Sequence, residues 1–205
     1  MFSYVAGQGL RALPLVLTVG LLVAAQSTRA AELRPAAAAS SPASPASIVG
    51  DGQYHSITNG GTTSNGSHLA LEVEGQCSSQ TGYADINVYD ASHASQQWKF
   101  FLDPDGTANI QDSCDPSLAL TAPTYTGGPA TLTHRDTSNI TPQQEWQVTQ
   151  DSTGAMTITS AVTVTDMHGV QSHSVLDTCG TWAAGSTVVV VPSTQSTTQK
   201  WTVLS

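Results

Sequence analysis

Short stretches dominated by Thr, Val, Ile and Tyr, separated by polar turn residues, fill the chain after about residue 51. Residues 84–90, 157–165 and 187–191 are examples. Gly, Asn, Asp, Ser and Pro bound these stretches, which is typical of strands and turns. None of them has the three-to-four residue apolar spacing of an amphipathic helix. The pattern therefore predicts an almost all-β domain.

A short motif, Gln-x-Trp, occurs three times in this region at intervals of about fifty residues. Its copies are Gln96 with Trp98, Gln144 with Trp146, and Gln199 with Trp201. Two further markers recur in phase with it: a strand centred on an isoleucine (Ile57, Ile110, Ile158) and a Leu-rich or Val-Leu segment (69–73, 118–122, 174–178). Three markers in one order, three times over, predict three equivalent structural units. Buried tryptophans and isoleucines should meet near the axis that relates these units.

Units of about fifty residues with about four short strands each are compatible with blades, a solenoid or a closed threefold barrel. Propellers normally need at least four blades, and polar caps of the kind that end a solenoid are not seen. Closure removes sheet edges that would otherwise favour aggregation. We therefore predict a β-trefoil over residues 51–205, with lobes at about 51–101, 102–150 and 151–205.

The first fifty residues have a different composition. Residues 1–30 resemble a secretory signal peptide, with a short n-region ending at Arg11, an apolar run over 12–25 and small residues for cleavage after Ala25 or Ala30. A signal anchor is the alternative, but the run is short for a membrane span. Residues 31–50 are rich in Ala, Ser and Pro and predict a disordered linker or pro-segment. We therefore expect a secreted, extracellular protein that does not insert into the membrane once the signal is removed.

Charge and the distribution of reactive residues exclude several functions. The chain carries 6 Lys and Arg against 15 Asp and Glu, a formal net charge of −9, and so lacks the basic surface that nucleic-acid binding requires. The six His are scattered without a thiolate or carboxylate at a metal-ligand spacing. No glycine pattern of a nucleophile elbow surrounds a serine. We expect no metal, no cofactor and no enzymatic activity.

The chain from about residue 53 to 205 resembles the ricin B-type lectin domain (R-type lectin), whose lobes are marked by Gln-x-Trp. The resemblance rests on the three motif copies with their Ile-containing strands and Leu-rich segments in phase. It implies a β-trefoil that binds carbohydrate, with glycans or glycoproteins as partners. In this family an acid follows the Leu-rich strand, an aromatic residue lies about ten positions before the Trp, and an amide stands next to the Gln.

The first lobe matches this site pattern best. Glu72 stands at the acid position, Tyr89 at the aromatic position, Ser95 at the amide position and Gln96 in the motif. It departs from the pattern twice, because Glu is longer than the usual Asp and Ser replaces the amide. The alternative is that Glu72 is a solvated carboxylate and Tyr89 a residue of the barrel wall.

The other two lobes lack part of the pattern. In the second lobe Thr121 replaces the acid, and the resemblance therefore implies a silent site. In the third lobe Asp177 matches the acid, but Val190 and its neighbours occupy the aromatic position. Trp182, on the adjoining loop, is a candidate to supply the missing ring.

Two features concern covalent modification. Cys77, Cys114 and Cys179 allow three choices of a single disulfide in an exported protein. We expect Cys77 to pair with Cys114, since both lie in loops of consecutive lobes, and an intermolecular bond through the odd thiol is the alternative. Asn65 opens an Asn-Gly-Ser glycosylation sequon, which is relevant if the source is eukaryotic.

The sequence thus predicts a secreted, non-enzymatic lectin with a weak glycan site in its first lobe. Trefoils also act as protease inhibitors through exposed loops, and that function is the main alternative. A non-binding structural trefoil and a hydrolase hidden in the same fold are the remaining ones.

Overall fold

A computed structural model of the chain describes residues 48–75, 77, 82–135, 137, 141–165, 168–179 and 182–204. The predicted signal peptide and most of the predicted linker lie outside these residues. The first described residue, Ile48, is buried in the core of the folded unit. No helix in the described ranges is long and apolar enough to cross a membrane.

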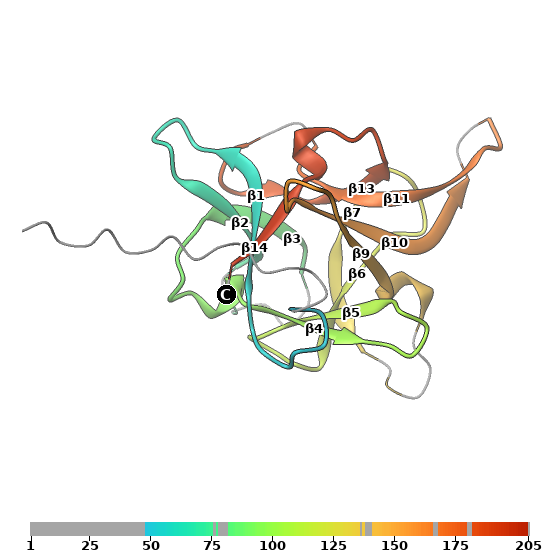
Figure 1. Cartoon of the computed structure of the whole chain (residues 1–205), viewed down its shortest axis with the longest axis horizontal. Coiled ribbons are helices and arrows are strands. Elements are labelled where there is room, and N and C mark those ends of the chain that lie inside the picture. Colours follow the sequence, from blue (N-terminus) through green and yellow to red (C-terminus); the bar gives the residue numbers. More distant parts are fainter. Residues whose placement is uncertain are drawn as a thin grey trace, which may run out of the picture. The chain divides into compact units, whose positions relative to one another are not determined.

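The described residues form an all-β fold with three short 3-10 turns (Figure 1). The first lobe contains β1 (Ser56–Thr62), β2 (His68–Val73), β3 (Ala84–Val88), η1 (Ala94–Gln96) and β4 (Trp98–Leu102). The second contains β5 (Ala108–Asp112), β6 (Leu118–Thr121), β7 (Gly128–Pro129), β8 (Thr131–His134), η2 (Pro142–Gln144) and β9 (Trp146–Gln150). The third contains β10 (Met156–Thr165), β11 (Gln171–Asp177), β12 (Ser186–Thr187), β13 (Val189–Pro192), η3 (Thr197–Gln199) and β14 (Trp201–Leu204).

The first and last strands of the three lobes close into a six-stranded barrel. Its order is β1, β14, β10, β9, β5 and β4, all neighbours being antiparallel, and an isolated bridge beside β1 returns to β4. Each lobe closes in an equivalent way, because the start of its first strand pairs with the Gln-x-Trp tryptophan that begins its last strand: His55 with Trp98, Ala108 with Trp146, and Met156 with Trp201. The last strand of each lobe also pairs with the first strand of the next, β4 with β5, β9 with β10 and β14 with β1.

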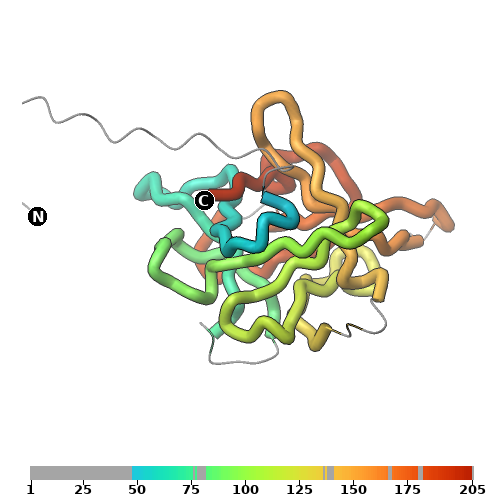
Figure 2. Tube along the Cα trace, turned by 60° about the horizontal axis from the view of Figure 1, so that its bottom comes forward, coloured from blue at the N-terminus to red at the C-terminus, as the bar shows by residue number. Residues whose placement is uncertain are grey.

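Three hairpins cap one end of this barrel, and a ring of backbone hydrogen bonds joins them. Ala84 N–H donates to the Ala130 carbonyl at 2.9 Å, Ala130 N–H to the Val188 carbonyl at 2.8 Å, and Val188 N–H to the Ala84 carbonyl at 2.8 Å. The backbone trace in Figure 2 passes through the three lobes in order, from cyan through green and yellow to red. This closed ring makes Ala84, Ala130 and Val188 equivalent positions of the three lobes.

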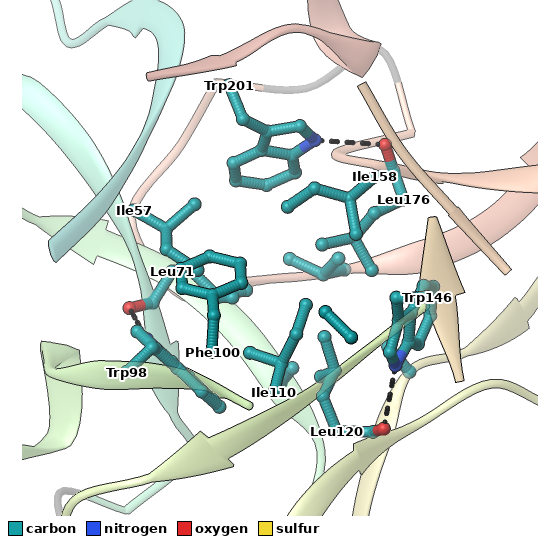
Figure 3. Close-up of a cluster of buried hydrophobic side chains, with 14 of the residues drawn as sticks. Ile57, Leu71, Trp98, Phe100, Ile110, Leu120, Trp146, Ile158, Leu176 and Trp201 are labelled. Atoms are coloured by element: carbon teal, nitrogen blue, oxygen red, sulfur yellow. Dashed lines mark hydrogen bonds between the residues drawn. The ribbon is translucent and has the colours of Figure 1, made fainter. Parts of the chain in front are cut away.

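The three motif tryptophans and the three marker isoleucines lie in one hydrophobic core, as the repeat predicts. All six side chains are fully buried, and Figure 3 shows the indoles placed around Ile57, Ile110 and Ile158. Each indole N–H donates to a carbonyl of the Leu-rich segment of its own lobe: Trp98 to Leu71 at 2.9 Å, Trp146 to Leu120 at 2.9 Å, and Trp201 to Leu176 at 3.1 Å. The tryptophans thus fill the core with their polar atom satisfied.

The predicted disulfide between Cys77 and Cys114 is confirmed. It joins the β2–β3 loop of the first lobe to the β5–β6 loop of the second, while Cys179 is an exposed free thiol. Asn65 lies exposed in the turn between β1 and β2, and its glycosylation remains a prediction.

Candidate functional site

The glutamine of each Gln-x-Trp motif reaches back to the residue directly after the last leucine of the Leu-rich or Val-Leu segment of its lobe. Its Nε2 donates to the Glu72 carboxylate (Gln96, 3.1 Å), the Thr121 hydroxyl (Gln144, 3.2 Å) or the Asp177 carboxylate (Gln199, 2.9 Å). The same amide also donates to a backbone carbonyl of the third strand: Val88 at 2.9 Å, His134 at 3.1 Å and Pro192 at 3.1 Å. The three candidate acid positions are therefore held by one repeated arrangement.

In the first lobe, three of the four predicted site residues form one hydrogen-bonded group. Ser95 Oγ donates to Glu72 Oε1 at 2.9 Å, and Gln96 Nε2 donates to the other carboxylate oxygen. The Glu72 side chain is only 1% exposed. Glu72 is therefore not a solvated carboxylate, because both of its oxygens accept bonds from inside the protein.

The fourth predicted residue, Tyr89, lies at the far end of the same hairpin. Its backbone N–H donates to the His68 carbonyl at 2.9 Å, and His68 precedes Glu72 by four positions on β2. At about 3.3 Å per residue this separates the two backbones by about 13 Å. The residue opposite Glu72 on β3 is instead Asp85.

Asp85 is a feature of the first lobe that sequence reasoning missed. Partial burial, and then the nearby carboxylates of Glu72 and Glu74, raise the pKa of Asp85 from 3.8 to about 6. The register of the β2–β3 hairpin, on which this placement depends, has no marker in the sequence. The first lobe thus contains a group of carboxyls rather than an acid beside an aromatic ring.

In the third lobe, Asp177 has the same anchoring with slightly more access to solvent. Its Oδ1 accepts the Cys179 N–H at 2.7 Å and its Oδ2 accepts from Gln199, and the side chain is 6% exposed. Val189 lies opposite Asp177 on β13. The carboxylate is therefore oriented by two donors and has an apolar neighbour.

Trp182 lies against β1 at the junction of the third and first lobes. A Cβ at Gly61 would overlap its ring, while the indole is 42% exposed. The Gly61 N–H donates to Asn59 Oδ1 at 3.1 Å, and Asn59 Nδ2 donates to the Thr198 carbonyl at 3.0 Å. The ring thus rests on backbone that is tied to the 3-10 turn before Gln199, and one of its faces is covered.

The second lobe replaces the acid with hydroxyl groups. Thr121 Oγ1 and Thr133 Oγ1 lie 2.8 Å apart, and Gln144 Nε2 donates to Thr133 Oγ1 at 2.9 Å. This network satisfies the Gln144 amide nitrogen without a charge, while the buried Oε1 atom of Gln144 has no hydrogen-bond partner within the described part of the chain. Among the described residues, no group of three His, Cys, Asp or Glu side chains is arranged to hold a metal ion.

No protein-family model matches the chain, and a search of curated proteins finds no match. Solved structures do match. The designed threefold-symmetric protein ThreeFoil has a TM-score of 0.58 at 18% identity, with 74% of this chain and 98% of that chain covered. The agglutinin from Rhizoctonia solani has a TM-score of 0.54 at 13% identity, with 75% and 94% covered.

A lectin from Polyporus squamosus has a TM-score of 0.53 at 16% identity, with 74% of this chain and 48% of the lectin chain covered. The described unit thus corresponds to about half of that longer protein. The low identities limit these likenesses to architecture. Together with the closed barrel and its three equivalent hairpins, they show that the chain has the β-trefoil fold predicted from its Gln-x-Trp repeat.

Proposed function

We propose that this protein is a secreted, non-enzymatic lectin, a carbohydrate-binding protein of the R-type kind. Two of the structures that share its fold support this function: one is an agglutinin, and the Polyporus squamosus lectin is bound to the epitope Neu5Aca2-6Galb1-4GlcNAc. The disulfide between Cys77 and Cys114 supports secretion, because such bonds persist in oxidising compartments.

The observation that carries the proposal is a difference between lobes that share one scaffold. The second lobe satisfies its motif glutamine with the hydroxyls of Thr121 and Thr133. The other two lobes place a carboxylate, Glu72 or Asp177, in the same contact. Burying a carboxylate costs more than burying a hydroxyl, so the contact with glutamine does not by itself explain the acids. Binding of a hydroxyl-rich ligand does, since an oriented carboxylate is a strong acceptor for sugar hydroxyls.

The third lobe combines the two elements of a sugar site. Asp177 supplies an acceptor oriented by Gln199 and the Cys179 N–H, and Trp182, five positions further along the chain, supplies a partly exposed aromatic ring for the apolar face of a pyranose. In the first lobe the proposed weak site consists of Glu72, Ser95, Gln96 and Tyr89. Its acid is more deeply buried, so binding there requires the hairpin to expose the Glu72 carboxylate.

A glycan-array screen of the mature chain tests the proposal with matched acid-to-amide variants. Asp177→Asn and Glu72→Gln remove one negative charge each with little change in shape, and Asp105→Asn, in an exposed turn, is the control. Loss of binding with Asp177→Asn identifies the third lobe, and loss with Glu72→Gln identifies the first.

If the third lobe is the site, the single variants Trp182→Ala and Asp177→Asn should each weaken binding of the same glycan. Absence of binding by the unaltered protein to any glycan would contradict the lectin function. A panel of proteases would then test the inhibitor alternative.

A further inference from the structure

A pocket of about 340 Å³ lies where the first lobe meets the second. It is lined by Gly82 and Tyr83, which precede β3, and by Thr131, Leu132 and Thr133 of β8. It is a shallow hollow that is largely open to solvent, not an enclosed cavity. The residue pattern of either lobe alone does not show this pocket, since its two walls come from different repeats.

The wall from the first lobe is fixed in place at two points. Tyr83 pairs with Thr131 in an antiparallel bridge, and the Leu132 N–H donates to the Gly82 carbonyl at 2.9 Å. Earlier in the same loop, the disulfide attaches Cys77 to the β5–β6 loop of the second lobe. Tyr83 is therefore positioned by the second lobe although it belongs to the first.

The side chains of this pocket provide an aromatic ring beside a set of hydroxyl groups. Tyr83 is 48% exposed, which leaves ring surface free for a ligand. Thr131 lies opposite Thr121 across β6 and β8, and Thr133, two positions along the strand, has its side chain on the same face. The Thr131 hydroxyl can donate and accept, while the Thr133 hydroxyl, which already bonds Thr121 and Gln144, keeps the capacity to accept a bond from a sugar hydroxyl.

The equivalent positions of the other two junctions have no aromatic ring. The backbone ring through Ala84, Ala130 and Val188 makes Pro129 and Thr187 the counterparts of Tyr83. Pro129 pairs with Val189 beside the third-lobe acid, and Thr187 pairs with Asp85 beside the first-lobe acid. The junction of the first and second lobes therefore has no acid at this position, and there Tyr83 pairs with Thr131 instead.

We propose that this junction is a binding site for an uncharged sugar, with Tyr83 as the stacking ring and the hydroxyls of Thr131 and Thr133 as hydrogen-bonding groups. The proposal rests on the lectin function and names a ligand class and a site for it. None of the described residues that line the pocket is charged, and the net charge of −9 disfavours anionic glycans. The second lobe, expected from its sequence to be silent, binds here through a ring contributed by the preceding lobe.

The variants Tyr83→Ala and Thr131→Val test the site, because Tyr83 is exposed, Thr131 is half-buried, and neither belongs to the hydrophobic core. Tyr125→Ala is the matched control, because Tyr125 is also an exposed tyrosine but lies outside the pocket, in the second lobe. Binding to arrayed neutral, sialylated and sulfated glycans is measured first, followed by calorimetric titration with the neutral glycans that bind. Thermal unfolding verifies that each variant is folded.

We expect Tyr83→Ala to weaken binding of a neutral glycan by about tenfold or more, as is usual for loss of an aromatic anchor. Thr131→Val should weaken the same glycan, and Tyr125→Ala should not. A further variant, Tyr83→Trp, reports directly on the site, since its fluorescence should change when the same sugar is added.

Two results would overturn the proposal, and they differ in what they leave standing. If Tyr83→Ala and Thr131→Val bind every glycan as the unaltered protein does, the junction site is wrong and the lectin function stands. If neither the unaltered protein nor Tyr83→Trp responds to any glycan, the lectin function and the junction site are both wrong.

Discussion

The pairing of Asp85 with Glu72 across the β2–β3 hairpin makes the stability of the protein depend on pH in a predictable direction. Burial and the carboxylates of Glu72 and Glu74 raise the pKa of Asp85 from 3.8 to about 6 in the folded state. The unfolded chain keeps the ordinary value near 4. Between these two values the folded protein retains the Asp85 proton while the unfolded chain releases it. The contribution of Asp85 to stability is therefore complete below about pH 4 and is lost as the pH rises through about 6.

The size of this effect follows from the pKa difference. At about 1.36 kcal/mol per unit, a pKa raised from 3.8 to about 6 corresponds to at most about 3 kcal/mol. Because Asp85 is only half-buried, solvent screens part of the penalty on its charge. We therefore expect the stabilising contribution to fall by about 1–1.5 kcal/mol between pH 4 and pH 7.

Urea unfolding of the unaltered protein and of Asp85→Asn at pH 4, 5, 6 and 7 measures this contribution. Asparagine cannot ionise, so the free energy of unfolding of the unaltered protein should fall relative to that of the variant as the pH rises. Asp105→Asn is a control: hydrogen bonds from Thr107 lower the pKa of Asp105, so its contribution is lost mainly below pH 4 and should stay nearly constant from pH 4 to pH 7. If the difference between Asp85→Asn and the unaltered protein is the same at every pH, the reasoning from burial and like charge is wrong.

A second variant separates the two causes. Glu72→Gln removes the nearby negative charge but leaves Asp85 partly buried, so it should lower the pKa of Asp85 only in part. Carboxyl titration by NMR in Glu72→Gln measures this shift. A full return of the Asp85 pKa to its ordinary value would show that charge, not burial, is the larger cause.

Three further predictions concern the scaffold. Trp201→Ala should lower the free energy of unfolding by about 3–5 kcal/mol in chemical denaturation, as is usual for a large buried ring, and a smaller loss would show that the core collapses around the vacancy. Replacing Cys77 and Cys114 by serine should cost about 4 kcal/mol, because the bond closes a loop with a sequence separation of 37, and unchanged stability would contradict this. Gly61→Ala should displace the ring of Trp182 and change the tryptophan fluorescence at a cost of about 1–3 kcal/mol, whereas an unchanged spectrum would refute the contact.

Much of the fold could be predicted because it depends on features with a fixed spacing in the sequence. Trp98, Trp146 and Trp201 recur with the isoleucine strands, and a repeat of this kind determines how many lobes there are and which residues meet at their axis. The Cys77–Cys114 bond could also be anticipated, since loops of consecutive lobes lie close together in a closed threefold fold.

The candidate sites were harder to predict, because their composition depends on strand register. Moving one strand by a single position sends every side chain to the opposite face of the sheet. The pattern of the family placed Tyr89 beside Glu72, whereas the hairpin pairs Glu72 with Asp85. The contact of Tyr83 with Thr131 crosses from one lobe to the next, so no pattern within a single repeat could indicate it.

The three lobes are thus one backbone arrangement with three different surface chemistries. In each lobe, three residues that pair with one another across neighbouring strands form a row. The first belongs to the preceding lobe, the second to the third strand of the lobe's own hairpin, and the third is the residue that the motif glutamine contacts. The rows are Thr187, Asp85 and Glu72; Tyr83, Thr131 and Thr121; and Pro129, Val189 and Asp177. The first row is acidic, the second is neutral with an aromatic ring, and the third is apolar with one acid.

The tryptophan N–H and the glutamine Nε2 of each motif make equivalent contacts under all three rows, so the frame of a lobe is shared although its row differs. Each row can therefore differ in its ligand without loss of the scaffold. Weak sites on a single chain gain avidity when one ligand presents several matching sugars. Under the proposed lectin function, we therefore expect three unlike rows to favour a branched or mixed glycan over a polymer of one repeated sugar.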